Sequence, residues 1–304
     1  MSVSARRGVA RVMSLNFYSF LIVASATFLL ASAGGVVGTF NVLKGQALIG
    51  DAVGHATFPG VILFFMIFKT RDPLILSLGA FVAGYLADRW IDYFNRQTKL
   101  ALDPLLAVAL STFFGLGLVL KSYIAGNLKY QEVSQAGLST YIFGQAAYLM
   151  EKDVKLLLFV AIFSLIVVCL TFRLVKAHLF DPTFSRLIGF PNRLVSLIIR
   201  FLSLLLIAVG LKLVGAILMA AFLVVPPIAA LQWCRKLHHT LALSGAIGGV
   251  SAVIGTYLSG LANGLATGPC IIIIMCLFAL ASLILAPIVK GANRQSKEVV
   301  EWEA

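Results

Sequence analysis

The stretch Gly50-Asp51-Ala52-Val53-Gly54-His55-Ala56-Thr57-Phe58-Pro59-Gly60 places an acid and an imidazole inside an apolar run over about residues 46–68. About 20 residues, each rising about 1.5 Å, cross the hydrocarbon core of a bilayer, so the run predicts a transmembrane helix. Asp51 and His55 are four residues apart and share one face of that helix. Because a charged side chain at the bilayer centre costs about 2.5–3.5 kcal/mol, the pair is a candidate functional site.

The chemistry of the pair points to a metal ion. A carboxylate and an imidazole on one helix face are two ligands for a divalent transition metal. The residues alone leave two alternatives open. One is that Asp51 pairs with a Lys or Arg of another helix, and the other is that His55 is a hydrogen-bonded packing residue.

The same run is expected to be interrupted at Pro59. Proline lacks an N–H, so the carbonyl of His55 loses its helical donor and needs protein, water or an ion as a partner. Gly50 and Gly54 leave room for another helix to approach closely. We therefore expect a notched helix whose polar side faces a cavity or a partner.

The composition indicates a membrane protein. Of 304 residues, 60% are hydrophobic and only 12% are charged, against about 25% charged in soluble domains. Apolar runs of spanning length recur along the whole chain, which predicts an all-α, polytopic transmembrane bundle of about eight to nine helices, as a single domain over residues 1–304. The net charge of +12 is attributed to basic cytoplasmic loops rather than to nucleic-acid binding.

The orientation of the chain poses a problem of parity. The basic start, with Arg6, Arg7 and Arg11, predicts an uncleaved first helix with its N-terminus in the cytoplasm. Five full crossings would then place the basic loop at residues 173–193 outside, against its Lys and Arg content. An additional crossing near residues 137–150 would restore the parity.

That basic loop predicts a short amphipathic helix over about residues 181–189. Asp181 is an N-cap residue, Pro182 suits the first helical position, and Gly189 ends the helix. The helix either lies on the lipid surface or docks into a cytoplasmic partner. Its apolar side chains are Phe184, Leu187 and Ile188.

Two other apolar runs carry unusual residues. Asp88, Arg89 and Asp92 end the third run, and they predict either a membrane-edge cluster with Arg89 reaching toward the surface or a second metal site. Pro226 and Pro227 stand inside a later run and predict a second helix break.

Residues 50–60 resemble a stretch of the permease subunits of ABC importers for zinc, manganese and iron. Members of that family carry Gly-Asp-Ala-(Ile/Leu)-Ser-His-Ala-x-x-Pro-Gly, and this chain departs from it at Gly54, where the family usually has Ser. Residues 180–184 together with Gly189 resemble the family's coupling-helix region. Residues 214–226 resemble its late Gly-to-Pro helix, so the resemblance covers nearly the whole chain.

The resemblance implies a multi-pass transport subunit of the bacterial inner membrane rather than an enzyme. Asp51 and His55 would be the metal residues, with the breaks at Pro59 and Pro226 near the pathway. The partners implied are a cytoplasmic ATPase subunit, a second permease subunit (identical or paralogous), an extracytoplasmic metal-binding protein and membrane lipid. The transported Mn, Zn or Fe would be cargo, with no permanently bound cofactor. The positions that would couple to the ATPase are Asp181, Pro182, Phe184 and Gly189.

The mechanism expected from these residues is ATP-driven import. The chain has no Gly-x-x-x-x-Gly-Lys-Ser/Thr motif, so a partner would have to cradle the phosphates. Asp51 and His55 from two facing subunits would give up to four ligands, and uptake would weaken as acid protonates the imidazole. The alternative is a proton-coupled secondary metal transporter that uses Asp51 and His55 as a proton relay. Dependence on ATP separates the two.

Overall fold

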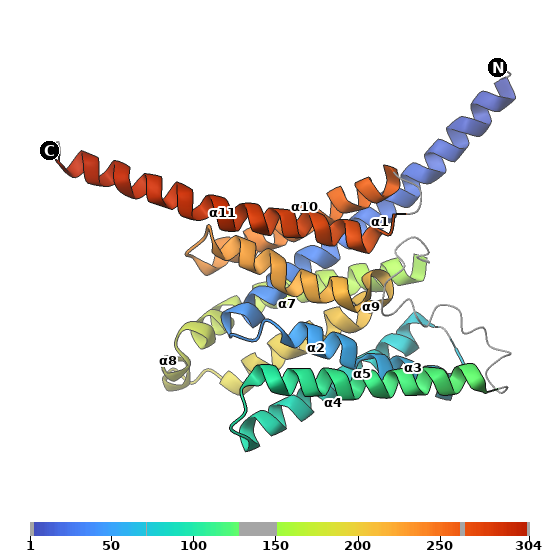
Figure 1. The fold of residues 1–304 in the computed structure, drawn as a ribbon, viewed down its shortest axis with the longest axis horizontal. Helices are drawn as coiled ribbons and strands as arrows, with labels where there is room; N and C mark the ends of the chain where they lie inside the picture. The colour runs from blue at the N-terminus through green and yellow to red at the C-terminus, as the bar shows by residue number, and fades with distance from the viewer. Residues whose placement is uncertain (1–2, 71, 128–150, 262–264, 303–304) are drawn as a thin grey trace.

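The computed structural model describes residues 3–70, 72–127, 151–261 and 265–302, and the described part is a bundle of helices (Figure 1). The helices are α1 Val3–Leu43, α2 Ile49–Ala56, α3 Phe58–Phe68, α4 Pro73–Gln97, α5 Leu102–Gly126, α7 Glu151–Phe180, α8 Pro182–Leu187, α9 Asn192–Leu231, α10 Leu237–Leu261 and α11 Thr267–Trp302.

Within these residues, nine segments are long and apolar enough to cross a membrane. This confirms the predicted polytopic bundle of about eight to nine helices. α2 and α3 together form one span, Ile49–Phe68, whereas α9 supplies two, Asn192–Lys212 and Val214–Leu231.

The two arms of α9 meet at Gly215, which has φ 79° and ψ 168°. Side chains rarely allow this conformation, so the reversal depends on glycine. A contact between the arms shows that they fold back on each other: a Cβ at Gly210 would overlap the sulfur of Met219. In a straight helix these two residues would be about 13.5 Å apart along the axis.

The break expected at Pro226 is not at that position. The backbone of α9 keeps helical dihedral angles through Pro226 and Pro227, and departs from them only at Gly215. A proline is tolerated in a membrane helix where neighbouring helices accommodate the carbonyls that it frees. Here the carbonyl of Leu223 lies so close to Gly38 of α1 that a Cβ there would overlap it.

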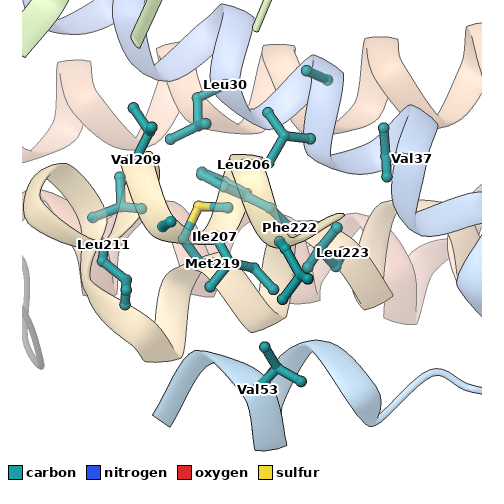
Figure 2. Packing of buried hydrophobic residues seen from close by; sticks show 14 of the residues in the cluster. Leu30, Val37, Val53, Leu206, Ile207, Val209, Leu211, Met219, Phe222 and Leu223 are labelled. Atoms are coloured by element: carbon teal, nitrogen blue, oxygen red, sulfur yellow. The ribbon is translucent and has the colours of Figure 1, made fainter. Parts of the chain in front are cut away.

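α9 lies at the centre of the packing, between α1 and α2 (Figure 2). Leu30 of α1, Phe222 of α9 and Val53 of α2 are at most 3% exposed. Glycines let the backbones approach, which is how helices associate within a membrane. A Cβ at Gly34 would lie 3.0 Å from the Cβ of Phe222.

The N-terminus and α8 lie at opposite ends of the bundle (Figure 1). Five described spans precede α8, and α5 ends and α7 begins at the same end as the N-terminus (Figure 1). A cytoplasmic N-terminus and a cytoplasmic α8 are therefore incompatible, and one of these two expectations is wrong. The crossing considered at residues 137–150 lies outside the described residues.

Candidate metal site

The helix that carries the site is interrupted at Thr57, between α2 and α3. Thr57 keeps helical angles, with φ −72° and ψ −21°, but two separate helices meet there and Pro59 is the second residue of α3. The hydroxyl of Thr57 donates to the carbonyl of Gly54 at 2.6 Å. This side-chain bond satisfies a carbonyl beside the interruption, as lipid surroundings require.

Asp51 and His55 lie one turn apart on α2, as their spacing predicts. His55 Nε2 is 3.6 Å from Asp51 Oδ1, which is too long for a hydrogen bond. Two donor atoms that each lie about 2.1 Å from a zinc ion are about 3.4 Å apart at the tetrahedral angle. The spacing of the pair therefore fits two ligands of one ion.

The two side chains differ in exposure. The side chain of Asp51 is 44% exposed, whereas that of His55 is 16% exposed. The ring of His55 meets that of Phe114 edge-on, with the centroids 5.2 Å apart. The imidazole is therefore largely enclosed by protein, whereas nearly half of the Asp51 side chain remains accessible.

A small cavity beside His55 joins four helices. Its walls come from α2, α3, α5 and both arms of α9: Gly54, His55, Thr57, Phe58, Val61, Phe114, Leu211 and Ala216. The reversal at Gly215 places Leu211 of one arm and Ala216 of the other in the walls of the cavity that His55 also lines. The cavity is lined mainly by apolar groups, so His55 is the one ionisable side chain among them.

Asp51 and His55 lie inside the bundle, away from the end at which α4 ends and α9 begins. Gln46 and Gly50, at the turn into α2, share a second cavity with Asp88 and Arg200. Arg200 is eight residues inside α9, or about 12 Å from its start. The turn between α1 and α2 therefore lies well below the ends of α4 and α9, and Asp51 lies deeper still.

Asp88 and Asp92 are held by an arginine that the sequence pattern did not single out. Arg200 donates from Nη1 to Asp88 Oδ2 at 3.3 Å and from Nη2 to Asp92 Oδ1 at 3.1 Å. The cluster joins α4 to α9, and Arg89 is its partly exposed member. The sequence did contain a signal for this ion pair, because an arginine inside an apolar run needs a partner of opposite charge.

No group of three or more His, Cys, Asp or Glu side chains gathers within the described ranges. Asp88 and Asp92 are engaged by a guanidinium, which leaves no support for a second metal site at this cluster. Asp51 forms its one ion pair among the described residues with His55. One copy of the described chain therefore offers an ion two ligands.

α8 is built as the sequence predicts. The carboxylate of Asp181 accepts from the backbone N–H of Thr183 at 3.0 Å, which caps the helix. Gly189 has φ 78°, as a residue that follows a helix end often does. Leu187 is 81% exposed and Ile188 is 45% exposed. The side chains of Pro182 and Phe184 lie outside the described set.

The comparisons with known proteins agree with one another. The model of the ABC 3 transport family matches residues 16–286. The zinc transport system membrane protein TroC of Treponema pallidum is 35% identical over 89% of this chain and 90% of its own. The manganese transport system membrane protein MntC of Bacillus subtilis is 37% identical over 87% of this chain but only 60% of its own length.

A solved structure has the same fold. PsaBC from Streptococcus pneumoniae, determined in complex with a Fab, contains a chain that superposes with a TM-score of 0.74. The two chains are 26% identical, and the match covers 86% of this chain and 89% of that one.

Proposed function

Because the chain belongs to the ABC 3 transport family, a family of multi-pass bacterial membrane proteins, we propose that it is the permease subunit of an ATP-driven importer of a divalent transition metal. Asp51 and His55 hold the ion during its passage. Relatives named for manganese and for zinc support a metal of this class. The Asp and His ligands accept both ions.

The observation that carries the proposal is a pair of metal ligands with room for more. Asp51 and His55 are spaced for one ion. The carboxylate is about half exposed, so an ion bound to it can also be reached by ligands from another chain. A second permease subunit that presents the same pair brings the total to four ligands, which completes a tetrahedral zinc site or, with water, an octahedral manganese site.

α8 is the element that we propose contacts the ATPase. It is short, capped at Asp181 and followed by exposed Leu187 and Ile188. An exposed leucine at a helix end, surrounded by a basic loop, suits a hydrophobic socket on a cytoplasmic partner. ATP hydrolysis by that partner supplies the energy, and an extracytoplasmic protein delivers the metal.

Uptake by proteoliposomes that contain the complete transporter tests the site. Asp51→Ala and His55→Ala should each reduce ATP-dependent uptake of manganese or zinc to background, because one ligand of each pair is lost. The matched controls are Asp103→Ala and His239→Ala, which remove exposed side chains of the same types. Unchanged uptake by the Asp51 and His55 variants would remove the site assignment, and uptake without ATP would exclude the importer class.

A further inference from the structure

The turn that leads into α2 is attached to one polar face of α9. Lys44 Nζ donates to Ser196 Oγ at 3.5 Å, and Asn41 Nδ2 donates to Ser203 Oγ at 3.0 Å. Ser196, Arg200 and Ser203 are spaced by four and three residues, so they lie on one side of the helix. The first arm of α9 therefore holds the end of α1 and the start of the turn that leads to the metal pair.

The start of the same arm is attached to α8. Ser185 Oγ of α8 donates to Asn192 Oδ1 at 2.6 Å, and the N–H of Phe190 donates to the carbonyl of Ser185 at 2.9 Å. The last turn of α7 joins this junction, because His178 Nε2 lies 2.9 Å from Ser196 Oγ. Ser196 thus contacts both the end of α7 and the turn before α2.

The path from this turn to the metal pair is short and well packed. The N–H of Gln46 donates to the carbonyl of Asn41 at 2.9 Å, and the N–H of Ile49 donates to that of Gln46 at 3.2 Å. The next residue, Gly50, packs on the second arm of α9, where a Cβ would lie 2.8 Å from Leu223 Cδ1. A shift of the turn is therefore expected to move Asp51, the first residue of the metal pair.

We propose that Lys44 and Ser196 are positioning residues, which transmit movement of α8 through the first arm of α9 to the metal pair on α2. The inference rests on the proposed function, because it assumes that an ATPase moves α8. A helix is stiff along its axis, so displacement at Asn192 reaches Ser196 one turn away and Ser203 two turns further. Hydrolysis then moves Asp51 relative to the metal ligands of the facing subunit, and the ion is released.

The test compares uptake with hydrolysis in the reconstituted, complete transporter. Ser196→Ala and Lys44→Met should lower the number of manganese or zinc ions imported per ATP hydrolysed by at least about fivefold, a size typical of coupling between sites. ATP hydrolysis in the absence of metal should remain, because neither residue lies at the ATPase. Ser25→Ala and Lys99→Met are the matched controls at exposed positions.

Further variants separate positioning from simple loss of stability. The double variant of Lys44→Met with Ser196→Ala should import as many ions per ATP as the more affected single variant. Both changes break the same contact, the one between Lys44 and Ser196. Ser196→Thr keeps a hydroxyl and should restore the ratio of ions to ATP. Co-purification of the ATPase with each variant measures assembly, and Lys44→Met reports on the link if Ser196→Ala assembles poorly.

The outcomes distinguish the two proposals. If the wild type imports metal with ATP and both variants keep the wild-type ratio, the link is overturned and the function stands. If the wild type itself shows no ATP-dependent uptake, the function is overturned. Additive losses in the double variant would also contradict the link, because the two side chains would then act through different contacts.

Discussion

Two glycines in the span that carries the metal pair differ in the space around them. Gly54 stands where the related permeases usually carry Ser, yet a Cβ at this position would have its nearest neighbours at 3.9 Å, in Ala216 and Ile207. Gly60, in the same span, has no such space, because a Cβ there would overlap the carbonyl of Gly79 on α4. The two glycines therefore have different roles.

Gly54→Ser should keep uptake and thermal stability near the wild-type values, because the side chain enters ordinary van der Waals space. Gly60→Ala should destabilise the protein by about 1–3 kcal/mol, the usual cost of overpacking. Thermal unfolding of the purified protein in detergent, together with uptake by proteoliposomes, measures both effects. Equal stability of the two variants would contradict the packing described for α3 and α4.

Lys44 gives the turn before α2 a dependence on alkaline pH. Burial, and then the positive charge of Arg200, lower the pKa of Lys44 from 10.5 to about 8. Between these two values the unfolded chain binds more protons than the folded chain, so the free energy of unfolding rises with pH across this window. Below about pH 8 lysine is protonated in both states, and this contribution to the slope vanishes.

The corresponding experiment is thermal unfolding of the purified protein at pH 7.5 and pH 9.5. The wild type should gain stability from this residue between the two values, and Lys44→Met should lose that gain. Lys99→Met, which removes an exposed lysine, should leave it intact. A pH dependence that Lys44→Met does not change would show that the lysine is not shifted as described.

At the scale of elements, the reversal within α9 matters most, because it brings both arms to the cavity that His55 lines. Leu211 of the first arm and Ala216 of the second line the cavity beside His55. The end of the first arm is fixed to α7 by Lys212 Nζ, which donates to Asp153 Oδ1 at 2.6 Å. The wall of the site therefore depends on one backbone conformation, that of Gly215.

Gly215→Ala should reduce stability by roughly 1–3 kcal/mol, the cost of holding an ordinary residue in a glycine conformation. It should also reduce metal uptake, because relaxation of the reversal moves the wall beside His55. Gly115→Ala is a suitable control, since that glycine is helical and a Cβ there would meet nothing within 4 Å. Unfolding temperature and uptake that match the control would argue against a strained reversal.

At the scale of the molecule, basic residues near α8 favour a cytoplasmic position for that end, whereas Arg6, Arg7 and Arg11 favour the opposite end. The connections α4–α5, α8–α9 and α9–α10 lie at the end that holds α8, and the α1–α2 turn faces the same end from deeper inside the bundle (Figure 1). Three of them carry the basic residues Lys44, Lys99, Arg235 and Lys236, and α8 itself carries Arg186. Cytoplasmic connections are enriched in Lys and Arg, so the α8 end is expected inside and the N-terminus outside.

Tags at the two ends of the chain test this orientation. A protease added to spheroplasts should remove a tag from the N-terminus and leave a C-terminal tag intact, because the C-terminal helix ends on the α8 side (Figure 1). The reverse pattern would contradict the orientation. Protection of both tags would mean that the termini share the cytoplasmic side.

Local chemistry made part of the structure predictable. Spacing and proline chemistry predicted the notched helix around Asp51 and His55, and cap residues predicted α8. Contacts between distant segments were not accessible in the same way. The partner of Asp88 is 112 residues away, and no local pattern identifies it.

The two-ligand geometry of Asp51 and His55 has a consequence for copies that have not yet met a partner. Among the described residues, such a copy offers an ion one carboxylate and one imidazole, which is an incomplete set of ligands. Under the proposed function, we therefore expect a single copy to bind the metal only weakly until it assembles with a second subunit.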